Sequence, residues 1–484
     1  SLTKICRLML TGLKSLVRKA TSIFASSKAQ TYPIIIPRSD HSLSRQQLSP
    51  NAVKVLYRLN KAGFDAYLVG GCIRDHLIGV DAKDFDVVTN ATPEEIHDLF
   101  SNSRLIGRRF RLVHVTFGRE IIEVSTFRAN SAQDDSASKP QESLKGKDSA
   151  RSAHGIMLRD NVYGSIEEDA ERRDFTFNAL YYNVQDFSIH DYCGGLEDIA
   201  NKKIRIIGDA RQRYQEDPVR MLRAIRFAGK LGFDLEEKTA APIKEMAHLL
   251  DHIPPARLFE EVLKLLGSGN GIKTFHLLRQ YGLFKYLFPD TEALLVSGWK
   301  RDDINPEAFI LQGLENTDKR LQAGKTTAPY FLYAVMLWPS VVLRHEEFQA
   351  QGMPVTPALH QAASMVLDNQ VASTAIPRRF STPMREIWDM QFRLPKRYGK
   401  RAFVLLEHPR FRAAFDFLLI REFSGTELGG LGAWWEAFQF ANEHEQRELI
   451  KSIDARANDK EGPKKRRPRR RRKSNAPQRE TPEE

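Results

Sequence analysis

The chain has 484 residues and a mass of 55.3 kDa, which is long enough for about three domains of ordinary size. Hydrophobic residues make up 42% and charged residues 28%, a balance typical of globular proteins. The three cysteines exclude a disulfide scaffold and lack zinc-ligand spacing, so we expect a reducing, cytoplasmic location. The net charge of +12 indicates a polyanionic partner, either nucleic acid or an anionic membrane surface.

This positive charge is concentrated at the two ends. Residues 1–39 contain seven basic residues and no acidic one, and residues 460–484 contain eleven basic and four acidic ones, which leaves residues 40–459 at −2. The N-terminal extension, 1–44, resembles a transit peptide or a helix that lies peripherally on a membrane; the alternative is a short, poorly ordered extension. Residues 456–484, rich in Arg and Lys, are predicted to be a disordered basic tail.

Residues 45–205 alternate short strand and helix patterns, which predicts an α+β head with a mixed sheet flanked by helices. Ser49-Pro50 marks the start of the first helix. Helices are expected over 51–62, 72–78 and 93–99, and strands over 65–69, 84–88, 105–106, 112–117 and 121–126. Residues 130–155 are polar with little to bury, which indicates a mobile loop.

The rest of the chain is predicted to be all α-helical, with a neck over 206–300 that binds nucleotide and RNA and a body over 301–455 that binds RNA. In the neck, helical spacing is found over 218–231, 238–248, 255–266 and 271–281. The apolar stretch 328–343 is shorter than the ~20 residues that a spanning helix needs, and it contains Pro329 and Pro339. We therefore expect a buried helix there and no transmembrane segment.

The first chemical motif contains Gly70, Gly71, Arg74, Asp84 and Asp86. Residues i and i+2 of a strand share a face, so two carboxylates would lie side by side and repel each other unless a cation binds between them. Mg²⁺ with phosphate oxygens suits such a pair, and paired glycines let backbone N–H groups approach a triphosphate. The motif predicts nucleotidyl transfer, whereas two such acids alone could simply mark an exposed strand end.

A third carboxylate is expected from Glu123, which interrupts an apolar strand. The alternatives are a salt bridge to Arg128 and a solvent-facing edge position.

Two further clusters combine acids and arginines. Residues 172–180 indicate the beginning of a helix, where Arg172 and Arg173 could hold phosphate and Asp174 a ribose hydroxyl, unless the charges form a purely structural network. In the second, Asp217 and Arg220 lie one helical turn apart, so a carboxylate acceptor and a guanidinium donor could read the edge of a base. The alternative is a helix cap with a surface ion pair.

These motifs resemble those of the class II nucleotidyltransferases, which comprise CCA-adding tRNA nucleotidyltransferases and bacterial poly(A) polymerases. The matching stretches are residues 70–75, 84–89, 172–180 and 216–227, in the family's order. Residues 105–115 and 155–169 resemble segments of the poly(A) polymerase branch, and the Arg/Lys-rich end is typical of it.

The resemblance implies a role for each matching residue. Asp84 and Asp86 would bind metal, with Glu123 as the third catalytic carboxylate. Nucleotide contacts would come from Gly70, Gly71 and Arg74 at the triphosphate, from Arg173, Asp174 and Asn178 at the sugar and phosphates, and from Asp217 and Arg220 at the base.

The expected activity is template-independent transfer of AMP from ATP to RNA 3′ ends with Mg²⁺, releasing pyrophosphate. We expect a monomer whose partners are RNA 3′ ends, ATP and the machinery of RNA decay. Three alternatives are a CCA-adding enzyme, a non-catalytic RNA-binding protein, and a metal-dependent phosphohydrolase suggested by His190-Asp191. The last lacks companion histidines, and Asp191 is expected instead to open a turn.

Overall fold

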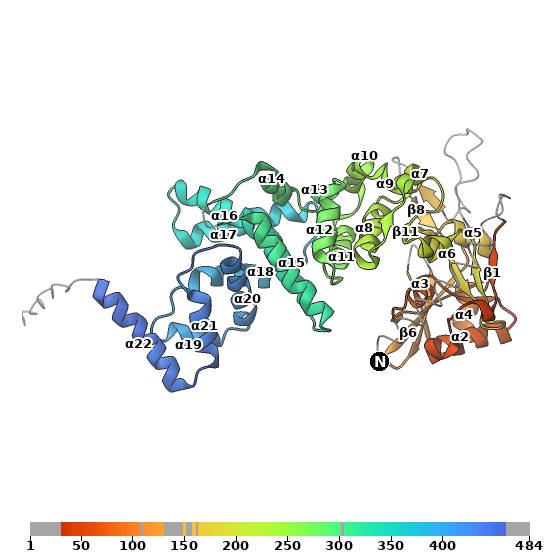
Figure 1. Ribbon diagram of the computed structural model, residues 1–484, viewed down its shortest axis with the longest axis horizontal. Coiled ribbons are helices and arrows are strands. Elements are labelled where there is room, and N and C mark those ends of the chain that lie inside the picture. Colours follow the sequence, from red (N-terminus) through yellow and green to blue (C-terminus); the bar gives the residue numbers. More distant parts are fainter. Residues whose placement is uncertain are drawn as a thin grey trace, which may run out of the picture.

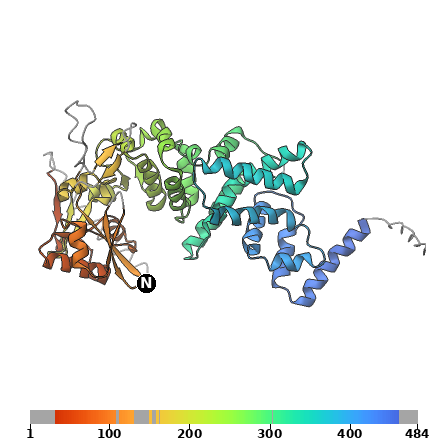
Figure 2. The same ribbon diagram turned by 180° about the vertical axis from the view of Figure 1, so that it is seen from behind.

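The computed structural model describes residues 31–107, 111–129, 149–151, 157–160, 163–301 and 304–460. These residues form an elongated molecule with a sheet-containing head at one end, a helical neck in the middle and a helical body at the other end (Figure 1). The view from behind shows the same order of parts (Figure 2). This arrangement confirms the predicted α+β head followed by an all-α region.

The head is built on an eight-stranded mixed sheet in the order β1-β10-β9-β2-β3-β6-β5-β4. Its strands are β1 (Ile34–Ile36), β2 (Ala66–Val69), β3 (Asp86–Thr89), β4 (Ser103–Ile106), β5 (Leu112–Phe117), β6 (Glu120–Thr126), β9 (Leu180–Tyr182) and β10 (Ile189–Asp191). Only β3 and β6 pair in parallel; every other neighbouring pair in this sheet is antiparallel. A crossover through α4 (Pro93–Leu99) and the hairpin of β4 and β5 separates these two strands in the chain.

Local sequence signals explain where the head helices begin. Ser49 caps α2 (Pro50–Lys61) by accepting a hydrogen bond from the backbone N of Ala52. Capping boxes open two other helices, with Thr92 and Glu95 at α4 and with Ser165 and Glu168 at α5 (Ile166–Glu171). Two more head helices, α3 (Gly71–Leu77) and α6 (Gly195–Ala200), begin directly after glycines.

Several predicted boundaries differ in the structure. Residues 31–44, assigned from the sequence to the N-terminal extension, contribute β1 to the head sheet and bury Leu43. The strand predicted over 84–88 begins at Asp86 instead, and Asp84 precedes it. Near the end of the predicted 130–155 loop lies β7 (Ser149–Arg151), which pairs with β8 (Met157–Asp160) just after that loop. Residues 1–30, 130–148, 152–156 and 461–484 lie outside the described residues, as do the predictions made for them.

The neck contains eight α-helices within the described range 206–301. They are α7 (Ala210–Glu216), α8 (Val219–Leu231), α9 (Glu237–Ala240), α10 (Ile243–Met246), α11 (Pro255–Leu266), α12 (Gly271–Gln280), α13 (Phe284–Leu287) and α14 (Pro289–Ser297). The single helix predicted over 238–248 is broken between α9 and α10, because Pro242 has no N–H to continue the hydrogen-bond ladder. The parallel pair β11 (Lys203–Ile204) and β12 (Asp234–Leu235) joins the head to the neck.

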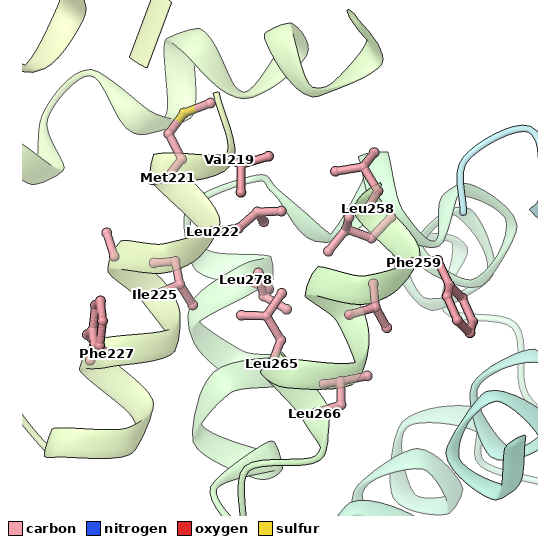
Figure 3. Close-up of a cluster of buried hydrophobic side chains, with 14 of the residues drawn as sticks. Val219, Met221, Leu222, Ile225, Phe227, Leu258, Phe259, Leu265, Leu266 and Leu278 are labelled. Atoms are coloured by element: carbon pink, nitrogen blue, oxygen red, sulfur yellow. The ribbon is translucent and has the colours of Figure 1, made fainter. Parts of the chain in front are cut away.

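The centre of the neck is an apolar core between α8, α11 and α12, in which Leu222, Ile225, Leu265 and Leu278 face one another (Figure 3). Phe227, on the other side of α8, instead packs edge-on against the head residues Phe175 and Phe177. α8 therefore connects the neck core to the head.

The body contains α15 (Pro306–Gln322), α16 (Pro329–Ala350), α17 (Val355–Val371), α18 (Arg378–Arg393), α19 (Arg401–Leu406), α20 (Phe411–Phe423), α21 (Leu431–Phe440) and α22 (Glu443–Lys460). The buried helix predicted from 328–343 is confirmed as α16, which contacts α15, α17 and α18. Among the described helices, none is both long and apolar enough to span a bilayer. A separate apolar group, the distal cluster, packs α19 to α22 against the end of α18; it includes Met390, Leu394, Leu405, Phe411 and Trp435.

Candidate active site

The glycine turn lies where β2 ends and α3 begins. Gly70 has a φ of 82°, a left-handed conformation that glycine adopts without steric cost. Its backbone N donates to the Leu180 carbonyl at 3.1 Å, and its carbonyl accepts from the backbone N of Ile73 and of Arg74. A Cβ at Gly70 would lie only 3.6 Å from the Asn178 carbonyl oxygen. The turn is thus held close to the segment that carries Arg173 and Asn178.

The carboxylates of Asp86 and Glu123 lie side by side on the adjacent strands β3 and β6. Asp86 pairs in register with Val69 on one side and with Glu123 on the other. Partial burial and the charges of Glu123 and Asp84 raise the pKa of Asp86 to about 6, although Arg173 acts in the opposite direction. The predicted neighbours therefore do converge, and their mutual repulsion favours a positively charged ligand.

The three carboxylates differ in whether a basic side chain pairs with them. Glu123 lies 3.6 Å from the Nε2 atom of His114, which faces it on β5. Within the described residues, neither Asp84 nor Asp86 forms a salt bridge with a basic side chain. Both remain available to a cation.

The carboxylate oxygens at this site are suitable ligands for a divalent metal ion. Asp84 and Asp86 offer hard oxygen ligands of the kind that Mg²⁺ prefers. The described part of the chain holds no preformed group of three His, Cys, Asp or Glu side chains around one position. An ion here would take carboxylates from the protein and complete its coordination with phosphate oxygens and water.

Arg74 is buried, and each of its three side-chain nitrogens donates a hydrogen bond to a protein group. Its Nε and Nη2 atoms donate to Asp75 Oδ1 at 2.9 and 2.7 Å, and its Nη1 atom donates to Asn178 Oδ1 at 2.7 Å. The guanidinium also lies over the rings of Phe177 and Phe227, at 5.4 and 5.0 Å from their centroids. These contacts fix the amide of Asn178.

The network continues from Asn178 into the neck. Asn178 Nδ2 donates to Asp174 Oδ1 at 3.0 Å, while Asp174 Oδ2 accepts from Nε of Arg223 on α8 at 2.6 Å. Burial alone would raise the pKa of Asp174, but Arg223 and Asn178 outweigh it and hold that pKa well below its ordinary value. The ion pair therefore joins the predicted sugar site to the neck.

Arg173 is held by two residues that the sequence motifs did not single out as functional. Its guanidinium pairs with Asp169 at 3.0 Å, and its Nε atom donates to the Tyr181 hydroxyl at 3.0 Å. The prediction that residues 172–180 begin a helix is wrong: α5 ends at Glu171, a short 3-10 turn covers Thr176–Asn178, and β9 starts at Leu180. The compact turn aims Arg173 and Asn178 toward Gly70.

Asp217 and Arg220 lie where α7 ends and α8 begins. Their backbones are hydrogen-bonded, but their side chains have different partners. Asp217 Oδ2 accepts from Arg257 of α11 at 2.7 Å, and Arg220 Nη1 donates to Glu216 Oε2 at 3.0 Å. The sequence showed the acid and the arginine but not that Arg257, forty residues away, faces Asp217.

The expectation for Asp191 is confirmed. Its carboxylate accepts from the backbone N of Cys193, Gly194, Gly195 and Leu196 at 2.9–3.1 Å, so it opens the turn into α6. His190 is hydrogen-bonded to Ser188. Both residues of His190-Asp191 therefore have structural partners, so this dipeptide no longer suggests a phosphohydrolase.

Comparisons with known proteins agree with this architecture. The poly A polymerase head domain family matches residues 66–205, the probable RNA and SrmB-binding site of polymerase A matches 232–295, and the polymerase A arginine-rich C-terminus matches 351–473. Among solved structures, a CCA-adding enzyme in an apo form has a TM-score of 0.55 at 18% identity, covering 87% of this chain and 99% of that one. The Thermotoga maritima CCA-adding enzyme complexed with tRNA has a TM-score of 0.51 at 19% identity over the same shares. With the matching head domain, this fold places the chain among the nucleotidyltransferases that have the CCA-adding enzyme fold.

Curated relatives distinguish the two branches of this class. Poly(A) polymerase I of Salmonella typhi is 47% identical over 98% of this chain and 99% of its own, and that of Haemophilus influenzae is 46% identical over 90% and 94%. The CCA-adding enzyme of Lactobacillus helveticus is 39% identical, but over only 44% of this chain and 49% of its own. The chain belongs to the poly(A) polymerase I family and is a polynucleotide adenylyltransferase.

Proposed function

We propose that the enzyme transfers AMP from ATP to RNA 3′ ends at the edge of the head sheet where Gly70, Asp86 and Glu123 meet. The observation that carries this proposal is the register of Asp86 with Glu123 on parallel strands, directly beside the glycine turn that follows Val69. The turn and the carboxylates on the strands would together form the place where the triphosphate binds.

Asp84 and Asp86 would hold Mg²⁺, which, when bound, would lower the pKa of the attacking 3′-hydroxyl and neutralise charge on the triphosphate. Glu123 lies beside Asp86 and would help to orient the oxygen atoms that bind the Mg²⁺ ion. Gly70 and Gly71 would line the triphosphate, with Arg173 close to Gly70. These groups act by positioning and charge stabilisation, the main requirements of phosphoryl transfer.

Arg74 is assigned a positioning role. Its side chain is only 4% exposed and its donors already face Asp75 and Asn178, so it would act on the nucleotide by fixing Asn178. Asp174 and Asn178 would then engage the sugar from a rigid network.

Asp217 and Arg220 would select the base. Adenine presents an amino donor beside a ring-nitrogen acceptor, which suits a carboxylate next to a guanidinium. Guanine and uracil present the opposite arrangement beside their carbonyl groups. Arg257 would orient Asp217 for this task through the 2.7 Å ion pair.

We also propose that the enzyme works in the cytoplasm as a monomer and delivers tailed RNA to decay enzymes. The cysteine content supports the reducing, cytoplasmic compartment. Peripheral membrane attachment through the N-terminal extension remains an expectation, because its residues 1–30 lie outside the described part of the chain.

One assay tests the proposal against a CCA-adding activity. An unrelated oligoribonucleotide is incubated with Mg²⁺ and each NTP separately. Long tails from ATP alone are expected; use of CTP with termination after three additions would contradict the proposal.

A further inference from the structure

The connection between α18 and α19 carries a dense group of cations in the body. Residues 390–406 contain no acidic residue, and five of them are basic: Arg393, Lys396, Arg397, Lys400 and Arg401. Together with Val404 and Leu405, all but Arg397 line a hollow with a volume of about 350 Å³. The basic hollow, as we call these six lining residues, is separate from the glycine turn and the carboxylates of the head.

Most of this charge is not neutralised by the protein. Arg393 lies 3.5 Å from Asp389, and Asp389 is shared with His360. Of the described residues, no acid forms a salt bridge with Lys396, Arg397, Lys400 or Arg401. By contrast, the exposed Lys319 and Lys451 of the body are paired with Glu315 and Glu448. The hollow therefore presents an anion-attracting surface.

An aromatic side chain accompanies the cations. Tyr398 is 46% exposed, so much of its ring is accessible to solvent beside the hollow. The guanidinium of Arg401 lies 4.5 Å from its ring centroid and donates a hydrogen bond to its hydroxyl. Exposed aromatic and guanidinium planes can each stack on a nucleobase.

The backbone below the hollow is anchored in the distal cluster. Leu394 and Leu405 are buried there, and Trp435 Nε1 donates to the Leu394 carbonyl at 3.1 Å. Arg397 lies over the ring of Trp434, with 5.1 Å between the guanidinium carbon and the centroid. The cations consequently project from a fixed platform, which lowers the entropy cost of binding.

We propose that the basic hollow binds a single-stranded RNA segment upstream of the 3′ end that is being extended. The inference rests on the proposed function, since it concerns the same RNA. Both views place α19 at the end of the molecule away from the head (Figures 1 and 2), so an RNA long enough to span the neck could occupy both sites. A concave site with an exposed ring fits a phosphate chain with bases better than a flat membrane surface.

The test uses the full chain and two RNAs with identical 3′ ends, one of about five nucleotides and one of about forty. The variant Lys396→Ala/Lys400→Ala/Arg401→Ala should bind the long RNA roughly tenfold more weakly. Its salt slope should fall by about 2, since each lost phosphate contact removes ~0.7 for single strands. Extension of the short RNA should be unchanged.

A matched control removes the same charge elsewhere in the body, as Lys319→Ala/Lys325→Ala/Lys451→Ala, and should leave both affinities and the slope unchanged. Tyr398→Ala should weaken binding of the long RNA at least about fivefold, whereas Tyr398→Phe should preserve it, because stacking needs only the ring.

Equal losses in the triple variant and in its control would overturn the inference, as would full affinity in the triple variant. If phosphatidylserine vesicles or polyglutamate displaced the bound long RNA, whereas further single-stranded RNA did not, the inference would also be overturned. Failure of the wild-type enzyme to extend even the short RNA would contradict the proposed function instead.

Discussion

Asp86 and Glu123 occupy the same register position on the parallel strands β3 and β6, beside the end of β2. Because β3 and β6 are adjacent and these residues are register partners, their side chains lie next to each other on one face of the sheet. The pair is costly without a cation: partial burial and the neighbouring carboxylates raise the pKa of Asp86 to about 6. The site is thus arranged for ligand binding at the expense of stability.

The raised pKa of Asp86 predicts how the stability of the folded chain depends on pH. The pKa of Asp86 is higher in the folded chain than in the unfolded chain, where it is near 4, so the folded state binds the extra proton between about pH 4 and pH 6. Its contribution to stability therefore falls as pH rises through that interval. Asp86→Asn should raise stability at pH 7 by roughly 1 kcal/mol, after allowance for solvent screening. Thermal unfolding at pH 5 and pH 7 without divalent metal checks this.

Addition of Mg²⁺ should distinguish the Asp86→Asn variant from the wild-type enzyme in the same measurement. Mg²⁺ should raise the melting temperature of the wild-type enzyme and leave that of Asp86→Asn nearly unchanged, because the variant has lost a ligand. An equal shift in both would argue against Asp86 as a ligand.

The ion pair between Asp174 and Arg223 is expected to support the joint between head and neck. Arg223→Met would leave the Asp174 carboxylate buried without its cation, which should cost about 3 kcal/mol. The exposed pair of Arg211 and Glu245 provides the control, and Arg211→Met should leave the free energy of unfolding unchanged. Equal effects of the two variants in denaturant titrations would contradict this role.

Much of the chemistry was predictable from local sequence because the motifs are short. Each of three motifs is contained in a stretch of a few residues: the glycine turn, Asp84 with Asp86, and the strand of Glu123. Long-range pairs were not predictable: the partners Arg223 and Arg257 depend on how α8 and α11 pack on the head. Residues 172–180 were misread as the start of a helix because their charges resemble an N-terminus, whereas tertiary contacts of Asn178 and Arg173 determine the turn.

Base selection should depend on Asp217. Asp217→Ala removes the acceptor for the adenine amino group, so KM for ATP should rise about tenfold and discrimination against GTP and UTP should decrease. Asp217→Asn keeps one acceptor and should lose less. Steady-state kinetics with each NTP test this; unchanged selectivity in Asp217→Ala would place base recognition elsewhere.

The basic tail should contribute affinity rather than chemistry. Deletion of residues 460–484 removes eleven basic residues, so RNA binding should weaken and its salt slope should flatten. AMP incorporation at saturating RNA should persist. A slope equal to that of the full chain would show that the tail makes no phosphate contacts.

The most direct test of the catalytic assignment is single-turnover AMP incorporation into an oligoribonucleotide by Asp84→Asn and by Asp86→Asn, with RNA affinity measured in parallel. We expect incorporation to fall at least about a thousandfold in each variant, since a metal ligand is lost, while RNA affinity stays within twofold of the wild type. Incorporation at the wild-type rate in either variant would contradict the account.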